Sequence, residues 1–416
     1  MKGFHRIKGA EDFYPAMLWQ REQVFSAMRA AALNHGFLEV DVPAIESFSL
    51  LAAKQGEEIR SQIFTIEKKG EEELAMRAEF TPGFARMFIE KQRELPKPVK
   101  WFSIGKVWRY ERPQAGRHRE FFQFNAEVYG SGKPEADAEV INLLISSLLG
   151  LGLMQNDFFV RVNNRKLLQG LLLEKIDKGN LERTLRAIDK RHKVSRNELL
   201  KELAFLGKSS QEIVELLDLT FEDLGRLQLK GLAKEGYDEL KQCMRLVRPG
   251  FARFDLSIAR GLAYYTGTVF EAYDSEMRFR ALAGGGRYDS LISMYGGADT
   301  PATGFAMGYA TISLLLARKK LEKEPELSPD IYVAVQDGAV CEQAFSLVAR
   351  LRQYKKVETD ITGRNLSNQL KHANRLKAKK LIVFGKEEAE SGLLKIKDML
   401  TGEEKLVQEK DIIQAI

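Results

Sequence analysis

Residues 101–130 read WFSIGKVWRYERPQAGRHREFFQFNAEVYG, and this stretch decides the centre of the predicted fold. An apolar run leads into Arg109, a loop rich in arginine follows at 112–119, and a second run alternates polar with apolar side chains. Alternation with a period of two and a turn-prone loop predict a β-hairpin with a basic tip. If the two strands pair around the loop, one face of the hairpin carries the side chains of Arg109, Gln123 and Glu127.

The polar face of this hairpin suits a ligand that carries both a phosphate and an amine. The planar, permanently charged guanidinium of arginine matches phosphate oxygens. An ammonium or imidazole group instead needs carboxylates and amides, which Gln123 and Glu127 supply.

The composition sets wider bounds. The chain has 416 residues, 29% charged and 44% hydrophobic, and a net charge of 64 − 58 = +6 with a pI near 9.0. This basicity permits nucleic-acid binding without proving it. Two distant cysteines and five scattered histidines predict neither a disulfide framework nor a histidine-based metal site. The polar N-terminus and the short apolar stretch at 141–154 predict no signal peptide and no membrane span, so we expect a cytoplasmic protein.

Three ordered motifs resemble those of a known family. The hairpin resembles motif 2 of class II aminoacyl-tRNA synthetases, and its RPQxGRxR loop resembles that of the histidyl-tRNA synthetases. Residues 260–271 resemble the histidine signature of that family, and 284–289 with 301–308 resemble its motif 3 region. The resemblance implies an α+β fold: an antiparallel sheet flanked by helices, with a helical insertion and a C-terminal α/β anticodon-binding domain.

The pattern of elements agrees with that layout. A helix at 15–35 and a strand at 37–43 resemble motif 1, which implies a homodimer. Strands are predicted at 62–67 and 73–77, with Thr81 capping the helix that follows. Later strands are predicted at 251–258, 268–273 and 279–283, and a helix begins near Gly308. A βαβαβ alternation predicts a parallel-type C-terminal domain.

We therefore divide the chain into five segments. They are a first core part (1–165), a helical insertion (166–248), a second core part (249–317), a linker (318–328) and the C-terminal domain (329–416). The basic run Lys190–Lys193 in the insertion is either a solvated surface or a contact with the tRNA acceptor stem.

The resemblance also implies a reaction. L-Histidine and ATP would give histidyl-adenylate and pyrophosphate, and the histidyl group would pass to tRNA(His). Arg109 and Arg260 would act as catalytic residues on either side of the α-phosphate, and both would also contact histidine. The remaining histidine-binding residues would be Glu79, Thr81, Gln123, Glu127, Tyr264, Tyr265 and Tyr288, with Tyr265 and Tyr288 on the imidazole side. If the adjacent Tyr264 and Tyr265 lie on a strand, one of them should face the pocket and the other the core.

ATP and tRNA would take further residues. ATP would contact Arg109, Glu111, Arg117, Arg119 and Gly286, with Glu111 at the adenine amino group. The tRNA would contact Gln114, Arg117 and Arg364. Mg²⁺ is implied with ATP, and no metal-binding residue is assigned.

Two departures from the family pattern leave an alternative open. Thr311 stands where most class II synthetases place an arginine for the γ-phosphate, and Ala263 replaces an acidic residue in the histidine signature. Either Arg117, Arg119 or Arg287 takes the γ-phosphate, or the chain is a histidine-sensing paralogue resembling the regulatory subunit of ATP phosphoribosyltransferase. A pure tRNA-binding module is the third option. The retention of Arg109 and Arg260 favours the enzyme.

Overall fold

The computed structural model describes residues 4–53, 61–68, 70–114, 116–259 and 264–416. The chain divides into two compact units, Met1–Lys323 and Glu324–Ile416. The first unit carries the hairpin, and the second begins within the segment that the sequence predicts as a linker.

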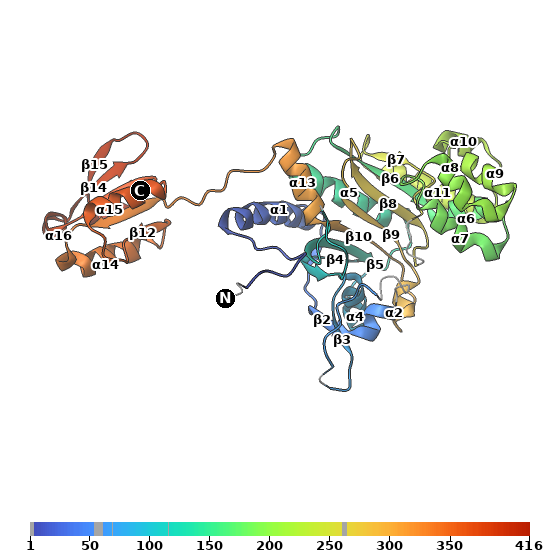
Figure 1. Ribbon diagram of the computed structural model, residues 1–416, viewed down its shortest axis with the longest axis horizontal. Coiled ribbons are helices and arrows are strands. Elements are labelled where there is room, and N and C mark those ends of the chain that lie inside the picture. Colours follow the sequence, from blue (N-terminus) through green and yellow to red (C-terminus); the bar gives the residue numbers. More distant parts are fainter. Residues whose placement is uncertain (1–3, 54–60, 69, 115, 260–263) are drawn as a thin grey trace. The chain divides into compact units, whose positions relative to one another are not determined.

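An eight-stranded sheet forms the centre of the described part of the first unit (Figure 1). Its order is β1-β4-β5-β10-β9-β8-β6-β7, with β1–β4 and β6–β7 parallel and the other neighbours antiparallel. The strands are β1 (Leu38–Glu39), β4 (Val99–Trp108), β5 (Glu120–Tyr129), β6 (Phe158–Asn164), β7 (Ala252–Phe254), β8 (Thr268–Asp274), β9 (Ala283–Arg287) and β10 (Ala302–Gly308).

The two faces of this sheet bury different clusters. One face packs on α1 (Pro15–Asn34), α5 (Pro134–Gly150) and α13 (Tyr309–Lys319), and Phe102 and Phe124 project into that core. The other face packs on α4 (Thr81–Lys91) and α12 (Leu291–Met294), with Trp101 and Tyr129. Side chains alternate along β5, so Gln123, Asn125 and Glu127 point away from the face that carries Phe124.

The predicted hairpin is confirmed: β4 and β5 pair antiparallel, with Gly105 opposite Gln123 and Trp101 opposite Glu127. The prediction at 279–283 is wrong, because β9 begins where that range ends and consists largely of glycines. Shorter elements replace other predicted strands. A small sheet joins β2 (Ile45–Ser47) to β3 (Leu74–Met76), next to α2 (Phe48–Ala53), and the predicted strand at 62–67 forms only a bridge from Thr65 to Ala75.

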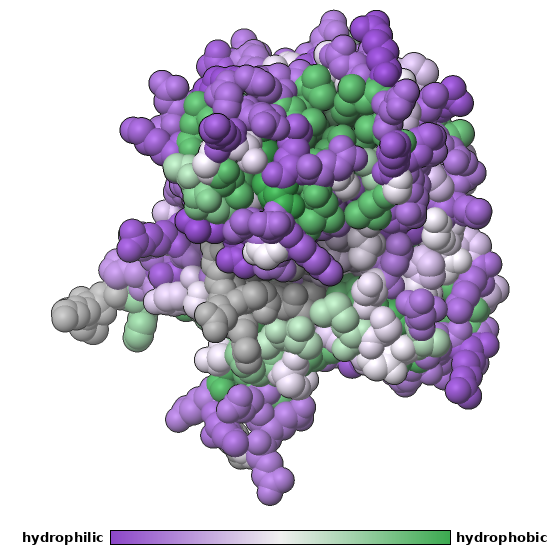
Figure 2. Space-filling view, turned by 90° about the vertical axis from the view of Figure 1, so that its right-hand side faces the viewer, coloured by the Kyte–Doolittle hydropathy of each residue, from purple (hydrophilic) through white to green (hydrophobic). Residues whose placement is uncertain are grey.

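The insertion is helical, as predicted, and lies beyond β6 and β7 (Figure 1). Its helices are α6 (Arg165–Leu173), α7 (Leu181–Ile188), α8 (Arg196–Glu202), α9 (Ser209–Leu216), α10 (Phe221–Arg226) and α11 (Gly231–Leu246). Figure 2 shows hydrophobic side chains gathered among hydrophilic ones on this end of the molecule. Exposed leucines of the insertion include Leu173, Leu227, Leu232 and Leu246. The surface is therefore mixed in hydropathy rather than uniformly polar.

The second unit has a mixed five-stranded sheet, β12-β11-β13-β14-β15. The strands β11 (Ile331–Val335), β12 (Val357–Thr359) and β13 (Lys380–Phe384) are parallel, as predicted. An unpredicted antiparallel extension follows, β14 (Leu393–Asp398) and β15 (Glu404–Gln408). Its helices are α14 (Cys341–Leu351), α15 (Leu366–Arg375), α16 (Lys386–Ser391) and α17 (Ile412–Ala415). Among the described helices of both units, none is long and apolar enough to cross a bilayer.

Candidate active site

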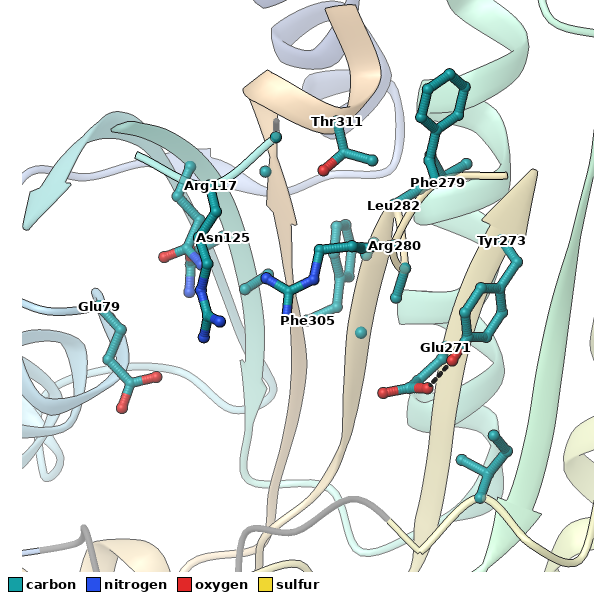
Figure 3. A pocket seen from close by; sticks show the side chains of 18 of the residues that line it. Glu79, Arg117, Asn125, Glu271, Tyr273, Phe279, Arg280, Leu282, Phe305 and Thr311 are labelled. Carbon is teal, nitrogen blue, oxygen red and sulfur yellow. Dashed lines mark hydrogen bonds between the residues drawn. The ribbon is translucent and has the colours of Figure 1, made fainter. Parts of the chain in front are cut away.

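A cavity of about 840 Å³ opens on the face of the sheet that carries the polar side chains of β5 (Figure 3). Residues from β5, β8, β9, β10 and the start of α13 line it, together with the loop at the hairpin tip. Of the predicted site residues, it brings together Glu79, Thr81, Arg109, Glu111, Arg117, Gln123, Glu127, Tyr264, Tyr265 and Tyr288. Sequence positions more than 200 residues apart therefore share one cavity.

Glu127 is the most buried carboxylate of this set, with 1% of its surface exposed. The Thr81 hydroxyl donates to its Oε1 at 2.6 Å, and the Tyr129 hydroxyl donates to its Oε2. Burial, reinforced by the Glu127 carboxylate, raises the pKa of Tyr129 and of Tyr288 well above the ordinary value. Both phenols therefore keep their protons at neutral pH and remain donors beside a fixed carboxylate.

Two amides beside Glu127 have unused acceptors. Gln123 is 7% exposed and Asn125 is 1% exposed, and both line the cavity. Gln123 Oε1 and Asn125 Oδ1 are buried and accept no hydrogen bond within the described part of the chain. A buried acceptor without a donor costs free energy, so these oxygens favour a ligand that brings N–H groups.

Arg109 is positioned by backbone contacts at the end of β4. Its Nε donates to the carbonyl oxygen of Ala78 at 2.9 Å, and its guanidinium lies 5.6 Å from the centre of the Phe121 ring. Its backbone N–H donates to the carbonyl oxygen of Arg119 at 2.9 Å, which continues the hairpin by one more pair. One edge of the guanidinium is thereby held, and its terminal nitrogens remain for an anion.

Three tyrosine rings form an aromatic wall. The rings of Tyr264 and Tyr265 lie 4.6 Å apart, and Tyr288 lies 5.8 Å from the first and 6.4 Å from the second. On a strand, one of the two adjacent tyrosines would face the core, because successive side chains point to opposite faces. They lie before β8 instead, outside any strand, and both line the cavity.

The basic loop at the hairpin tip is held by internal contacts. Arg117 forms an ion pair with Glu111, and Arg119 Nε donates to the Glu111 carbonyl oxygen at 3.2 Å while its guanidinium stacks 4.1 Å from the Tyr110 ring centre. Gln114 and Arg117 form a bridge across the loop. Gln114 and Arg119 do not line the cavity, whereas Glu111 and Arg117 do.

Glycines let β9 and β10 lie close behind the cavity. A Cβ on Gly285 would overlap the Gly304 carbonyl oxygen, and one on Gly304 would lie 2.6 Å from the Ala126 carbonyl oxygen. Close backbone approach, rather than a tight turn, explains this glycine run. Gly286 lies on the same strand, with a φ of 159°, and it does not line the cavity.

Arg287 is not available to a phosphate. It is 3% exposed, forms an ion pair with Asp137 at 3.0 Å, and also contacts Asp289 at 3.0 Å. Its candidacy for the γ-phosphate is therefore wrong, because its charge is used inside the fold. Arg260 and Ala263, which the sequence also singles out, lie outside the described residues.

Sequence reasoning missed residues on the far wall. Glu271 and Tyr273 on β8 line the cavity and hydrogen-bond to each other (Figure 3). Their alternation around buried Ala272 was a usable signal. Arg280 also lines the cavity, as a single cation in the run Phe279–Ala283.

The basic run in the insertion is largely neutralised. Lys190 pairs with Glu202, Arg191 with Asp218, and Lys193 with Asp189. His192 Nε2 lies 2.8 Å from Asp255 and 2.9 Å from the Ser257 hydroxyl, and His192 lines the cavity edge. This run contacts the core as well as solvent, which neither of the two earlier interpretations included.

In the C-terminal unit, Arg364 precedes the capped helix α15. Its guanidinium and backbone N–H both contact Asp360 at 2.7 Å, and the Asn365 side chain accepts the cap hydrogen bond from Asn368. Within the described residues, no group of three His, Cys, Asp or Glu side chains could hold a metal ion.

Comparisons with known proteins agree with this geometry. The family described as Histidyl-tRNA synthetase matches residues 9–312, and the Anticodon binding domain matches 330–416. The chain is 38% identical to a histidine–tRNA ligase of Halobacterium salinarum over 96% of this chain and 95% of that protein. It is 37% identical to one of Pyrococcus horikoshii over 99% of this chain and 98% of that protein.

Solved structures show the same fold. The histidyl-tRNA synthetase of Nostoc matches with a TM-score of 0.81 and 21% identity over all of both chains. An ATP phosphoribosyltransferase regulatory subunit/histidyl-tRNA synthetase of Bacillus halodurans matches with a TM-score of 0.76 and 20% identity, covering 92% of this chain and 98% of that one. The fold alone therefore does not separate the two functions.

The antiparallel sheet, the polar hairpin and the matched domains define a class II aminoacyl-tRNA synthetase. Within that class, the chain belongs to the histidyl-tRNA synthetase family. The chain is 37–38% identical to histidine–tRNA ligases over nearly its full length, and this similarity favours the enzyme over the regulatory alternative.

Proposed function

We propose that the cavity binds L-histidine and ATP side by side and joins them as histidyl-adenylate before the histidyl group passes to tRNA(His). The observation that carries this proposal is the buried carboxylate of Glu127 beside unused amide acceptors, with Arg109 in the same cavity. The same cavity can thus bind an ammonium and a phosphate.

The histidine ammonium lies at the buried end in this proposal. Glu127 supplies the negative charge, the Thr81 hydroxyl and Gln123 Oε1 supply oxygen acceptors, and Glu79 lines the same cavity. Because a carboxylate at a buried position attracts positive charge strongly, an ammonium is a better occupant here than a neutral group. The tyrosine wall of Tyr264, Tyr265 and Tyr288 then takes the imidazole through ring contacts and hydroxyl groups.

Arg109 orients the reacting groups. Its free guanidinium edge is suited to hold the histidine carboxylate and the α-phosphate together, which places the attacking oxygen near phosphorus. Arg260 has the matching role on the opposite side by its place in the histidine signature. Histidine supplies its own nucleophile, so the protein contributes position and charge.

The hairpin tip serves the rest of ATP and the tRNA end. Glu111 takes the adenine amino group, and Arg117 and Arg119 take phosphate, which requires the Arg117–Glu111 ion pair to open or shift. Gly286 supports close backbone approach, and Gln114 contacts tRNA. Mg²⁺ enters with ATP, because phosphate oxygens and water are its usual ligands at nucleotide sites, and there it neutralises phosphate charge.

The C-terminal unit recognises tRNA in this scheme. Arg364 stands at the N-terminus of α15, where backbone N–H groups and positive charge favour an RNA phosphate. Its contact with Asp360 fixes the side chain near that end of the helix. The five-part division of the chain, with the anticodon-binding segment at 329–416, follows from this assignment.

We also propose a homodimer in the cytoplasm. The N-terminal segment, α1 and the edge of the sheet expose apolar side chains, among them Tyr14, Met17, Leu18, Leu33 and Leu38. Exposed apolar side chains favour burial against a second copy. Light scattering coupled to gel filtration tests this, since a monomer at micromolar concentration would contradict it.

The experiment for the central proposal is exchange of labelled pyrophosphate into ATP. Purified full-length chain with Mg²⁺ is expected to exchange label only when L-histidine is present. Exchange with no amino acid, or none with histidine, would contradict the proposal. Histidine binding without exchange would favour the regulatory alternative.

A further inference from the structure

The start of α13 carries no arginine, yet a neighbouring segment brings one into the same cavity. Gly308 N–H donates to the Leu282 carbonyl oxygen at 3.4 Å, and Leu282 N–H donates to Ala272 at 2.8 Å. The segment that joins β8 to β9 therefore runs beside the first residues of α13. Arg280 stands two positions before Leu282 and shares the cavity with Thr311.

The cations of the cavity differ in their partners. Arg117 pairs with Glu111, Lys193 with Asp189, and Arg278 with Glu276. Counting only the described residues, Arg109 and Arg280 line the cavity without a carboxylate partner. Arg109 is assigned to the α-phosphate, so Arg280 is the cation whose charge the proposed function leaves unused.

The side chain also points the right way. Figure 3 shows the Arg280 guanidinium directed into the cavity, toward the wall that carries Arg117 and Asn125, with Thr311 nearby. An inward, unpaired cation in a cavity that must hold several phosphate charges is better explained by an anion.

We propose that Arg280 binds the β- and γ-phosphates of ATP, and the pyrophosphate that leaves, in place of the arginine absent at Thr311. This inference rests on the proposed function. Negative charge on the leaving pyrophosphate grows as the α-phosphorus to oxygen bond breaks, and a guanidinium fork stabilises it by paired hydrogen bonds. Arg280 is thus a substrate-binding residue of the same site.

The test compares Arg280→Ala with Arg278→Ala. Both side chains are exposed and stand on one segment, but Arg278 is paired with Glu276. Calorimetry with ATP and with AMP separates the outer phosphates from the rest of the nucleotide. We expect Arg280→Ala to weaken ATP binding about 10- to 100-fold, the range for a charged hydrogen-bonding group, and to leave AMP binding unchanged. Arg278→Ala is expected to change neither.

Equal loss of ATP and AMP affinity, or no loss of ATP affinity, would overturn the assignment of Arg280. In the exchange assay the same variant is expected to raise the KM for ATP and for pyrophosphate, with the KM for histidine unchanged. A wild-type chain without exchange would contradict the proposed function itself. If the wild-type chain exchanges pyrophosphate and the Arg280→Ala variant has the same KM for ATP and for pyrophosphate, this inference alone is contradicted.

Discussion

The hydroxyl of Thr81 donates a hydrogen bond of 2.6 Å to Oε1 of Glu127, and this contact ties the first turn of α4 to strand β5. The helix packs on the sheet through Phe84 and Phe88, so the two residues are held by rigid elements. A buried carboxylate with fixed donors on both oxygens is preorganised for a cation, because little reorientation is needed on binding.

Glu127→Gln is expected to weaken histidine binding while ATP binding stays unchanged. Removing the charge that faces the ammonium should cost about 1.5–3 kcal/mol, or roughly 10- to 150-fold in affinity. Calorimetric titration with histidine measures it. Glu120→Gln is the matched control, because Glu120 lies on the same strand, pairs with Lys106 and lines a different cavity. Equal effects of the two variants would contradict the assignment.

Gly285→Ala is expected to destabilise the first unit strongly. The new Cβ would overlap the Gly304 carbonyl oxygen and lie 2.7 Å from the Phe270 ring, so β9 and β10 must separate. We expect a loss of about 3 kcal/mol, at the upper end of the range typical of overpacked cores. Gly179→Ala, where a Cβ meets nothing within 4 Å, provides the control in urea unfolding. Similar midpoints for both variants would refute the close-approach argument.

Acid is expected to weaken the contact between the insertion and the core at Asp255. Burial opposes ionisation there, but hydrogen bonds from His192 and Ser257, with the nearby charge of Arg161, hold the pKa of Asp255 below its ordinary value of 3.8. The carboxylate therefore stabilises the fold fully above that value, and the contribution is lost as the pH falls through the lower native pKa.

Asp255→Asn tests this pH dependence. At neutral pH the variant should lose about 1–3 kcal/mol of unfolding free energy, and the difference from wild type should shrink as the pH falls below 3.8. Chemical unfolding at several pH values measures both. A difference that stays constant down to acid pH would show that the charge of Asp255 does not contribute.

A chain that ends at Lys323 is expected to form adenylate but to charge tRNA poorly. The boundary falls between the two compact units, and every described residue of the cavity lies in the first. Pyrophosphate exchange should therefore survive, while tRNA charging falls because contacts with the anticodon arm are lost. Charging at the full-length rate would contradict the role of the C-terminal unit, and an unfolded product would show in circular dichroism.

The hairpin residues were predictable because strand alternation is a local property: Gln123 and Glu127 differ by an even number of positions and share a face. Long-range partners were not. Arg287 looked available for phosphate until the fold placed Asp137 beside it, 150 positions away. In the sequence alone, the glycines of β9 are typical of a turn. Only the neighbouring strands of the sheet show that the backbone of β10 approaches them closely.

The measurement that tests the account most directly is charging of tRNA(His) with labelled histidine by the full-length chain. The account predicts histidyl-tRNA that accumulates only with ATP, and no product when another amino acid replaces histidine. Histidine and ATP binding without any charged tRNA would contradict it and would favour a regulatory protein that uses the same fold.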